Sequence, residues 1–219
     1  LFQESIDYFV EQGFKPHPVT VFPIGKLADA FQFMGGARHI GKIIVSMEGT
    51  VNVAPPEEMK FDANASYMIT GGASGFGLGV AEWMTTKNCK NLVLLSRSGT
   101  KTEEEAATVQ RMRDKGVTVM LAKGSVDNQQ DMDRVFKEIK DTMPPLKGIQ
   151  HAAMVLDDGS IPEITHKRYM SVFVPKAVGC WILHEATKDM ALDHFLSYSS
   201  ISAIYGNPGQ VSYVGANSF

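Results

Sequence analysis

Three glycines, Gly71, Gly75 and Gly77, have the spacing G-x-x-x-G-x-G and stand where a short apolar run gives way to a helical pattern. Glycine lets a turn adopt positive φ and lets the backbone come close to a ligand. A helix that begins at such a turn directs N–H groups and the positive end of its dipole toward an anion. The spacing therefore predicts a loop that binds the pyrophosphate of a dinucleotide. We expect the contacts to come from Thr70, Gly71, Gly72, Ser74, Gly75, Phe76 and Gly77.

An arginine stands at the end of the next predicted strand. NAD-binding sites place a carboxylate about 20 residues after the loop, where it contacts the ribose hydroxyls. Here the strand ends in Ser96 and Arg97, and no carboxylate is present at that position. A guanidinium pairs with a 2′-phosphate, which a carboxylate would repel. The sequence thus favours NADPH over NADH, with Ser96 and Arg97 at the phosphate; the alternative is that Arg97 is a solvated loop charge.

The elements that would position these residues alternate regularly from residue 66 onward. Short apolar runs with β-branched residues alternate with segments of helical periodicity. This order predicts an α/β fold, a Rossmann-like doubly wound parallel sheet that is truncated at the C-terminus. We expect strands at 67–70, 91–95, 117–122, 148–152 and 195–199, and helices at 77–87, 103–115, 129–141 and 165–188.

The chain divides into three parts by its pattern. Residues 1–50 predict a small α/β unit with a helix near the start, strands at 19–22 and 40–45, and a helix at 28–34. Residues 51–64 contain two adjacent prolines and lose the periodicity, which predicts a linker. Residues 65–219 form the main domain. Because the chain starts at Leu1 and stops at Phe219 without a tail, we expect a fragment of a longer polypeptide.

Composition excludes several classes of protein. The 219 residues are 44% hydrophobic and 21% charged, as in an ordinary globular protein that buries a core. The formal net charge of −3 does not support a nucleic-acid-binding protein, whose footprint would be basic. No apolar run approaches the ~20 residues of a membrane span. Two cysteines allow no disulfide framework, which favours a reducing, cytoplasmic setting.

A serine pair and a tyrosine near the end of the chain carry a family resemblance. Ser200 stands at the end of the fifth predicted strand, and Tyr213 follows it by 13 positions. Asn217 lies four positions after Tyr213, and Lys176 lies 24 positions before Ser200. This pattern resembles the short-chain dehydrogenase/reductase superfamily, and more closely the ketoreductase domains of polyketide and fatty acid synthases. The common enzymes of this superfamily have Tyr-x-x-x-Lys. Here asparagine, Asn217, stands four positions after the tyrosine and the lysine, Lys176, lies earlier in the chain, an arrangement typical of the synthase domains.

The resemblance implies a role for each of these residues. Tyr213 would give a proton to the substrate oxygen, and Ser200 would hydrogen-bond the carbonyl. Lys176 would lower the pKa of the tyrosine and hold the cofactor ribose, and Asn217 would fix the lysine or a relay water. The implied reaction is NADPH-dependent reduction of a β-ketoacyl thioester on an acyl carrier protein, without a metal. Singly, each residue also has a structural explanation, such as a turn serine or a solvated lysine.

The same resemblance adds residues around the cleft. His151, Ala152 and Ala153 follow the fourth strand and would contact the cofactor. Where family members have Asp-Val against the adenine, this chain has Ser125 and Val126, so we expect a weaker adenine contact. The triplet Leu156, Asp157 and Asp158 resembles the signature of B-type ketoreductases, which give a D-configured alcohol; an ordinary exposed turn is the alternative. Tyr205 stands where the A-type pattern has tryptophan.

The first 50 residues resemble the C-terminal end of medium-chain-type enoylreductase domains. The segments AFQFM at 30–34 and RHIGKIIV at 38–45 carry this resemblance. An enoylreductase followed by a ketoreductase implies a reducing synthase, whose other domains would be partners and which would form a homodimer. Two alternatives remain: a free-standing short-chain dehydrogenase acting on a small ketone or alcohol, and a silent nucleotide-binding remnant.

Overall fold

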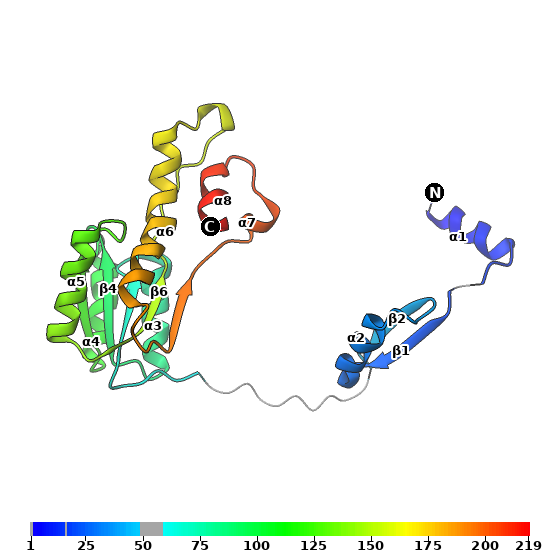
Figure 1. The fold of residues 1–219 in the computed structure, drawn as a ribbon, viewed down its shortest axis with the longest axis horizontal. Helices are drawn as coiled ribbons and strands as arrows, with labels where there is room; N and C mark the ends of the chain where they lie inside the picture. The colour runs from blue at the N-terminus through cyan, green and yellow to red at the C-terminus, as the bar shows by residue number, and fades with distance from the viewer. Residues whose placement is uncertain (1, 16, 49–58) are drawn as a thin grey trace. The chain divides into compact units, whose positions relative to one another are not determined.

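A computed structural model describes residues 2–15, 17–48 and 59–219 of the chain. The chain forms two compact units, Leu1–Glu57 and Glu58–Phe219. Most of the predicted linker lies outside the described residues, because residues 49–58 are not among them. Figure 1 shows both units, which we describe separately.

The first unit contains a two-stranded parallel sheet. Strands β1 (Val19–Pro23) and β2 (Lys42–Ser46) pair along their whole length, and they are connected through the short helix η1 (Ile24–Lys26) and helix α2 (Leu27–Gly35). Helix α1 (Phe2–Glu11) precedes them and buries no residue. Large apolar side chains such as Phe31 and Ile40 are exposed, as expected for a piece without further strands.

The second unit is built on a five-stranded parallel sheet of order β5-β4-β3-β6-β7. Helices cover both faces of this sheet (Figure 1). This is the predicted Rossmann-like fold. Its strands are β3 (Ser66–Thr70), β4 (Asn91–Ser96), β5 (Thr118–Lys123), β6 (Leu146–His151) and β7 (His194–Ser197). Its helices are α3 (Gly75–Thr86), α4 (Glu103–Asp114), α5 (Gln129–Thr142), η2 (Ile161–Glu163), α6 (His166–Thr187), α7 (Ser202–Tyr205) and α8 (Val211–Ser218).

Alternate residues of the central strands build two cores, one on each face of the sheet. Tyr67 and Ile69 of β3 pack with the apolar side of α3 and α4, whereas Met68 packs with α5 and α6. Because successive strand residues point to opposite faces, a fully apolar strand indicates that both faces are covered. All five residues of β3 are buried, so this strand is the centre of the unit.

The residues just before β3 belong to the second unit. Phe61 is buried in the core, and its ring contacts Tyr67 edge-on with centroids 5.0 Å apart. The Phe61 amide donates to the carbonyl of Lys87 at 2.8 Å, and the Asp62 amide donates to the Tyr67 hydroxyl at 3.0 Å. The pattern-based linker boundary at residue 64 therefore falls inside the packed unit, because one buried aromatic ring in a polar stretch gives no periodic signal.

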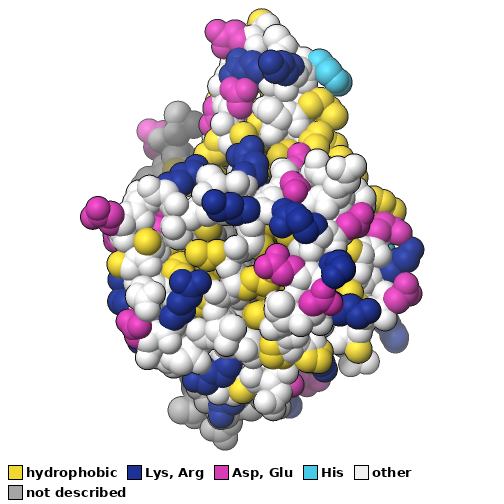
Figure 2. All heavy atoms as spheres, turned by 90° about the vertical axis from the view of Figure 1, so that its left-hand side faces the viewer, with side chains coloured by type: hydrophobic (Ala, Val, Ile, Leu, Met, Phe, Trp, Pro, Cys, Tyr) yellow, Lys and Arg dark blue, Asp and Glu magenta, His cyan; other side chains and the backbone are white. Residues whose placement is uncertain are grey.

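Side chains fix where the helices of the second unit begin. The Thr102 hydroxyl and the Glu105 carboxylate form a reciprocal capping box at the start of α4. Asn128 caps α5 and Thr165 caps α6 through hydrogen bonds to amides three residues later. On one side of this unit, basic and acidic side chains are interspersed over the surface (Figure 2). No helix in the described ranges is both long and apolar enough to cross a bilayer.

Candidate active site

The cleft lies at the carboxyl ends of the strands, beside the point where the strand order reverses. β3 pairs with β4 on one side and with β6 on the other, so the loops after β3 and β6 diverge. In open α/β sheets this point is where ligands bind. The glycine-rich loop from β3 to α3 and the segment after β6 form its two sides.

Two glycines are required by the geometry of this loop. Gly71 has φ +68°, and a Cβ there would lie 3.1 Å from the Ala152 oxygen. A Cβ on Gly77 would overlap the carbonyl oxygen of Gly71, so the start of α3 packs directly on the loop. Within residues 59–219 no side chain caps the start of α3, and its N–H groups point toward the loop region. The cradle fits a pyrophosphate.

The first hollow of the cleft lies beside Arg97. It is lined by Thr70, Gly71 and Ser74 of the loop, by Ser96 and Arg97, by Ser125 and Val126, and by Ala153. Lys101 also lines it, so two cations, Arg97 and Lys101, border this hollow. The Ser125 hydroxyl donates a hydrogen bond to the Asp127 carboxylate, so its remaining lone pairs can only accept.

The second hollow adjoins the first and shares Gly71, Ser74 and Met154 with it. It contains Gly75, Phe76 and Gly77 of the loop, Ala152 after β6, and the polar side chains of Lys176 and Tyr213. Tyr198 and Ser199 complete its wall. The lysine and the tyrosine come from α6 and α8, so two helices distant in sequence bring them to one hollow beside the loop.

Lys176 is a buried cation with a backbone partner. Only 8% of its surface is exposed, and its ammonium donates to the carbonyl oxygen of Tyr198. Burial lowers the pKa of Lys176 below its ordinary value. The Tyr198 ring is held by its hydroxyl, which donates to Gln150 at 2.5 Å, and by edge-on contact with Phe76.

A buried histidine supports the main chain at this lysine. His151 Nε2 lies 3.0 Å from the Lys176 carbonyl oxygen, which can only accept, so Nε2 carries the proton. Its Nδ1 then accepts from the Thr70 hydroxyl at 2.7 Å, and Thr70 Oγ1 accepts from the Ala153 amide at 3.1 Å. Burial lowers the pKa of His151 to about 4, which keeps this ring neutral.

Ser200 and Asn217 are held by contacts within the C-terminal segment. Ser200 Oγ accepts from the Ser202 amide at 3.1 Å at the start of α7, and Ser200 is not among the lining residues of the hollow. Its neighbour Ser199 lines the hollow and donates to the Asn217 carbonyl oxygen at 2.8 Å. Asn217 Nδ2 donates to the Tyr213 carbonyl oxygen, and no described residue partners the buried Asn217 Oδ1. Asn217 and Lys176 line a small cavity together.

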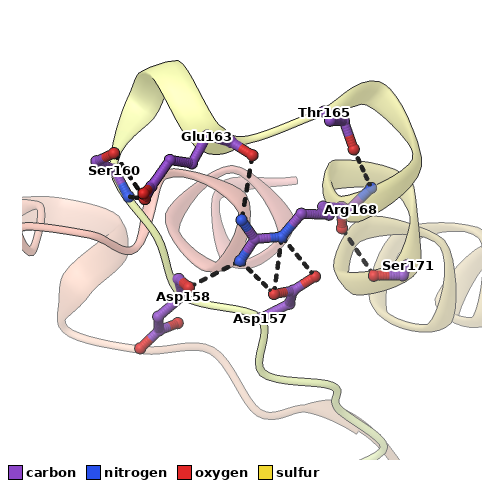
Figure 3. Close-up of polar contacts among 7 residues, drawn as sticks. All are labelled: Asp157, Asp158, Ser160, Glu163, Thr165, Arg168 and Ser171. Atoms are coloured by element: carbon purple, nitrogen blue, oxygen red, sulfur yellow. Dashed lines mark hydrogen bonds and ion pairs between the residues drawn. The ribbon is translucent and has the colours of Figure 1, made fainter.

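Asp157 and Asp158 lie beside the first turn of α6, as Figure 3 shows. The Asp157 carboxylate is paired with Arg168, which holds the pKa of this carboxyl below its ordinary value. Neither aspartate lines the two hollows, and the Leu156 side chain is 55% exposed.

Comparison with known families decides the identity of the second unit. A family model described as the KR domain matches residues 65–219, most of the chain. The chain belongs to the KR domain family. KR, or ketoreductase, domains of polyketide synthases are oxidoreductases that reduce β-ketoacyl groups.

Similar proteins carry this ketoreductase domain in much longer chains. The chain is 32% identical over its full length to a highly reducing polyketide synthase from a Fusarium species, and 37% identical over 95% of its length to a mycocerosic acid synthase-like polyketide synthase from Mycobacterium tuberculosis. It spans only 9% and 10% of those two proteins. A solved N-terminal ketoreductase from the macrolactin assembly line matches with a TM-score of 0.68 and 30% identity, over 74% of this chain and 33% of that one.

Most residues that the sequence predicts for the cofactor lie in the two hollows of the ketoreductase domain. Gly72 and His151 do not: a Cβ on Gly72 would lie 2.7 Å from the Ile69 carbonyl oxygen, so this glycine packs against β3, and His151 is fully buried. Sequence reasoning missed Lys101, Met154, Tyr198 and Ser199. A second cation four positions after Arg97 was a usable signal for Lys101, whereas nothing in the pattern singles out Met154.

Proposed function

We propose that this chain catalyses the NADPH-dependent reduction of a β-ketoacyl thioester to a β-hydroxyacyl thioester. The observation that carries the proposal is the second hollow: Lys176 and Tyr213 line it together with the glycine-rich loop, and it adjoins the first hollow, which contains Arg97. An anion cradle, a phenol and a buried cation at one place are what hydride transfer to a carbonyl requires from a protein.

The cofactor fits the cleft by its charges and its close approaches. The loop at Gly71–Gly77 and the start of α3 would hold the pyrophosphate, and Arg97 with Lys101 would pair with the 2′-phosphate. Ser125 would accept a hydrogen bond from the adenine amino group, since its own proton is engaged by Asp127. NADPH, when bound, supplies the hydride that reduces the β-carbon.

Tyr213 would supply the proton. Its phenol gives the O–H proton to the substrate oxygen as the alkoxide forms, and the Lys176 ammonium beside it stabilises the phenolate that remains. Water then restores the proton through the small cavity where Lys176 and Asn217 lie, with Asn217 Oδ1 as an acceptor on that path. A serine hydroxyl orients the carbonyl by donating a hydrogen bond. Ser200, the residue that the family resemblance suggests, uses its oxygen only as an acceptor from the Ser202 amide, whereas Ser199, which lines the hollow, would first have to release the Asn217 carbonyl oxygen.

The substrate would arrive on an acyl carrier protein of the same synthase. Support comes from the relatives, which are polyketide synthases that exceed this chain about tenfold in length. The other domains of that synthase would be partners, and a homodimeric parent would bring two such sites together. A polyketide and a fatty acid synthase are both consistent with these residues.

The first unit would be the C-terminal end of an enoylreductase domain. Its parallel strands β1 and β2, with α2 between them in the chain, form one βαβ unit. Its exposed apolar residues, such as Phe31 and Ile40, suit a piece whose other strands lie elsewhere in the polypeptide.

Steady-state NADPH oxidation tests this function. The full-length protein is mixed with NADPH and a short β-ketoacyl thioester, absorbance is followed, and the β-hydroxyacyl product is identified by mass spectrometry. The proposal expects turnover that depends on both components, with NADH a much poorer substrate. NADPH binding without any product would overturn it.

A further inference from the structure

Residues 152–160, between β6 and η2, form neither helix nor strand, although Met154 among them lines both hollows of the cleft. A loop of this length holds one conformation only where tertiary contacts fix it. Here the contacts come from Arg168, the third residue of α6. Figure 3 shows its guanidinium between the loop and the end of η2.

Every nitrogen of the Arg168 guanidinium makes a hydrogen bond. Nε donates to both carboxylate oxygens of Asp157 at 3.0 Å, and one terminal nitrogen donates to Asp157 and, at 2.9 Å, to the carbonyl oxygen of Asp158. The other terminal nitrogen donates to the Glu163 carbonyl oxygen at 3.1 Å. This planar, many-point contact is specific to arginine, because a lysine has one nitrogen at its end.

Local helix stability does not explain this arginine. A cation in the first turn of a helix faces the positive end of the helix dipole, which is unfavourable. Gly159 packs closely on the guanidinium, since a Cβ there would lie 3.0 and 3.1 Å from its two terminal nitrogens. The Arg168 and Asp157 side chains are about two-thirds buried in this contact. The sequence therefore places a glycine and a carboxylate where the arginine needs them.

The same loop is hydrogen-bonded to the start of α8. The Gly159 amide donates to the Gly209 carbonyl oxygen at 2.8 Å, and Gln210 Nε2 donates to Asp158 Oδ2 at 2.9 Å. Gln210 directly precedes α8, the helix that carries Tyr213. A continuous set of contacts thus runs from Arg168 through residues 157–159 to the helix of the proposed proton donor.

We propose that Arg168 is a positioning residue that fixes residues 156–159 against the start of α8 and so determines from which side the β-ketoacyl chain reaches Tyr213. This inference rests on the proposed function. It assigns the Asp157 carboxylate to Arg168 rather than to the substrate. The apolar side chains of Met154 and Leu156, both half exposed, are then the groups that this loop offers to the acyl chain.

The test compares wild type with Arg168→Met in the full-length protein, with a β-ketoacyl N-acetylcysteamine thioester and NADPH. The β-hydroxy products are separated by chiral chromatography. We expect the share of the minor enantiomer and the KM for the thioester each to rise about tenfold in the variant, while the KM for NADPH stays within about twofold. A merely structural role would lower kcat and impair both substrates alike.

Matched variants isolate the contact. Arg111→Met removes an exposed arginine of α4 that lies 3.5 Å from Glu82 of α3 and lines neither hollow, and it should leave both products and KM values as in wild type. Asp157→Asn should reproduce Arg168→Met, and the double variant should be no worse than either single one, because both changes break one contact. Arg168→Lys should restore part of the selectivity.

The outcomes separate the two proposals. Wild type without any reduction would overturn the proposed function and this inference with it. Wild type that reduces the thioester, beside an Arg168→Met variant with unchanged enantiomer ratio and thioester KM, would overturn this inference alone. If Arg168→Met fails to fold, Asp157→Asn and Gln210→Leu, which break the contacts at either end of the loop, decide the question by the same readouts.

Discussion

Lys176 and Tyr213 are the pair on which the proposed chemistry depends at the scale of single residues. An ordinary phenol has a pKa near 10 and donates its proton poorly at neutral pH unless a charge stabilises the phenolate. In the proposed mechanism the Lys176 ammonium, which lines the same hollow and donates to the Tyr198 carbonyl oxygen, would provide that charge.

Replacing the phenol should therefore remove catalysis but not binding. We expect Tyr213→Phe to lower kcat by about 10² to 10⁴, the usual contribution of a general acid, with the Kd for NADPH unchanged. Tyr205→Phe is the matched control, because that tyrosine is 81% exposed on α7. A Tyr213→Phe variant with wild-type turnover would show that another group donates the proton.

Arg97 should determine the choice of cofactor. Charge-assisted hydrogen bonds to a phosphate contribute about 1.5 to 3 kcal/mol, so Arg97→Gln is expected to raise the KM for NADPH by about 10-fold to 100-fold. NADH lacks the 2′-phosphate, and its KM should not rise. Arg111→Gln serves as a control for the loss of a surface arginine. Equal effects on the two cofactors would place the 2′-phosphate elsewhere.

His151 should make stability depend on pH. Its pKa is about 4 in the fold against 6.5 for the free group, so between these values only the unfolded chain takes up the proton. The free energy of unfolding must then fall as pH falls through this window, in total by about 3 kcal/mol.

The measurement is denaturant unfolding of wild type and His151→Gln across that range. Between pH 6.5 and 4 the free energy of unfolding of wild type should fall more than that of His151→Gln, by about 3 kcal/mol. His184→Gln, which changes an exposed histidine of α6, should give the same pH dependence as wild type. Parallel curves for wild type and His151→Gln would contradict a buried neutral histidine.

At the scale of elements, the contact of α3 with the glycine loop is the critical one. Gly77→Ala places a Cβ on the Gly71 carbonyl, so the helix start must move away from the cradle. Such overpacking costs about 1 to 3 kcal/mol, and we expect NADPH binding to weaken by at least tenfold.

The same helix offers a control. A Cβ on Gly79 meets nothing within 4 Å, so Gly79→Ala should keep NADPH binding and stabilise α3 by up to about 1 kcal/mol. Isothermal titration with NADPH and thermal melts compare the two variants. Equal NADPH affinities of Gly77→Ala and Gly79→Ala would show that the glycine loop does not bind the cofactor.

The regular elements were predictable because their signals are local. The strands β3 to β7 and the helices α3 to α6 start within a few residues of the predicted positions, since apolar runs, glycine turns and capping residues act over short distances. Helices α7 and α8 were not predicted. Both are short and contain serines. Helix α8 packs against α6, where a Cβ on Gly215 would lie 2.7 Å from the Tyr169 hydroxyl, and α7 packs against α8.

Contacts between distant residues could not be predicted from the pattern. His151 was expected at the cofactor, but its partners Thr70 and Lys176 enclose it from two other elements. Likewise, no sequence pattern indicates that Arg168, 11 residues later, donates hydrogen bonds to the Asp157 carboxylate. Ser199 rather than Ser200 lines the hollow because α7 begins immediately after the pair and uses the Ser200 oxygen.

At the scale of the whole molecule, the two units differ in how complete they are. The second unit has two buried cores, one on each face of its sheet. Among the described residues of the first unit, Ala30 alone is a buried apolar residue. The proposed chemistry therefore lies within the second unit, and the first is expected to gain its core from other parts of a synthase.

The most direct test of ketoreduction follows the hydride itself. The full-length protein is incubated with a β-ketoacyl thioester and NADPH that carries deuterium at the transferable position of the nicotinamide, and the product is analysed by mass spectrometry and NMR. We expect wild type to form a product with one deuterium at the β-carbon, and Tyr213→Phe not to form it. A protein that binds NADPH yet leaves the β-carbon without deuterium would contradict it.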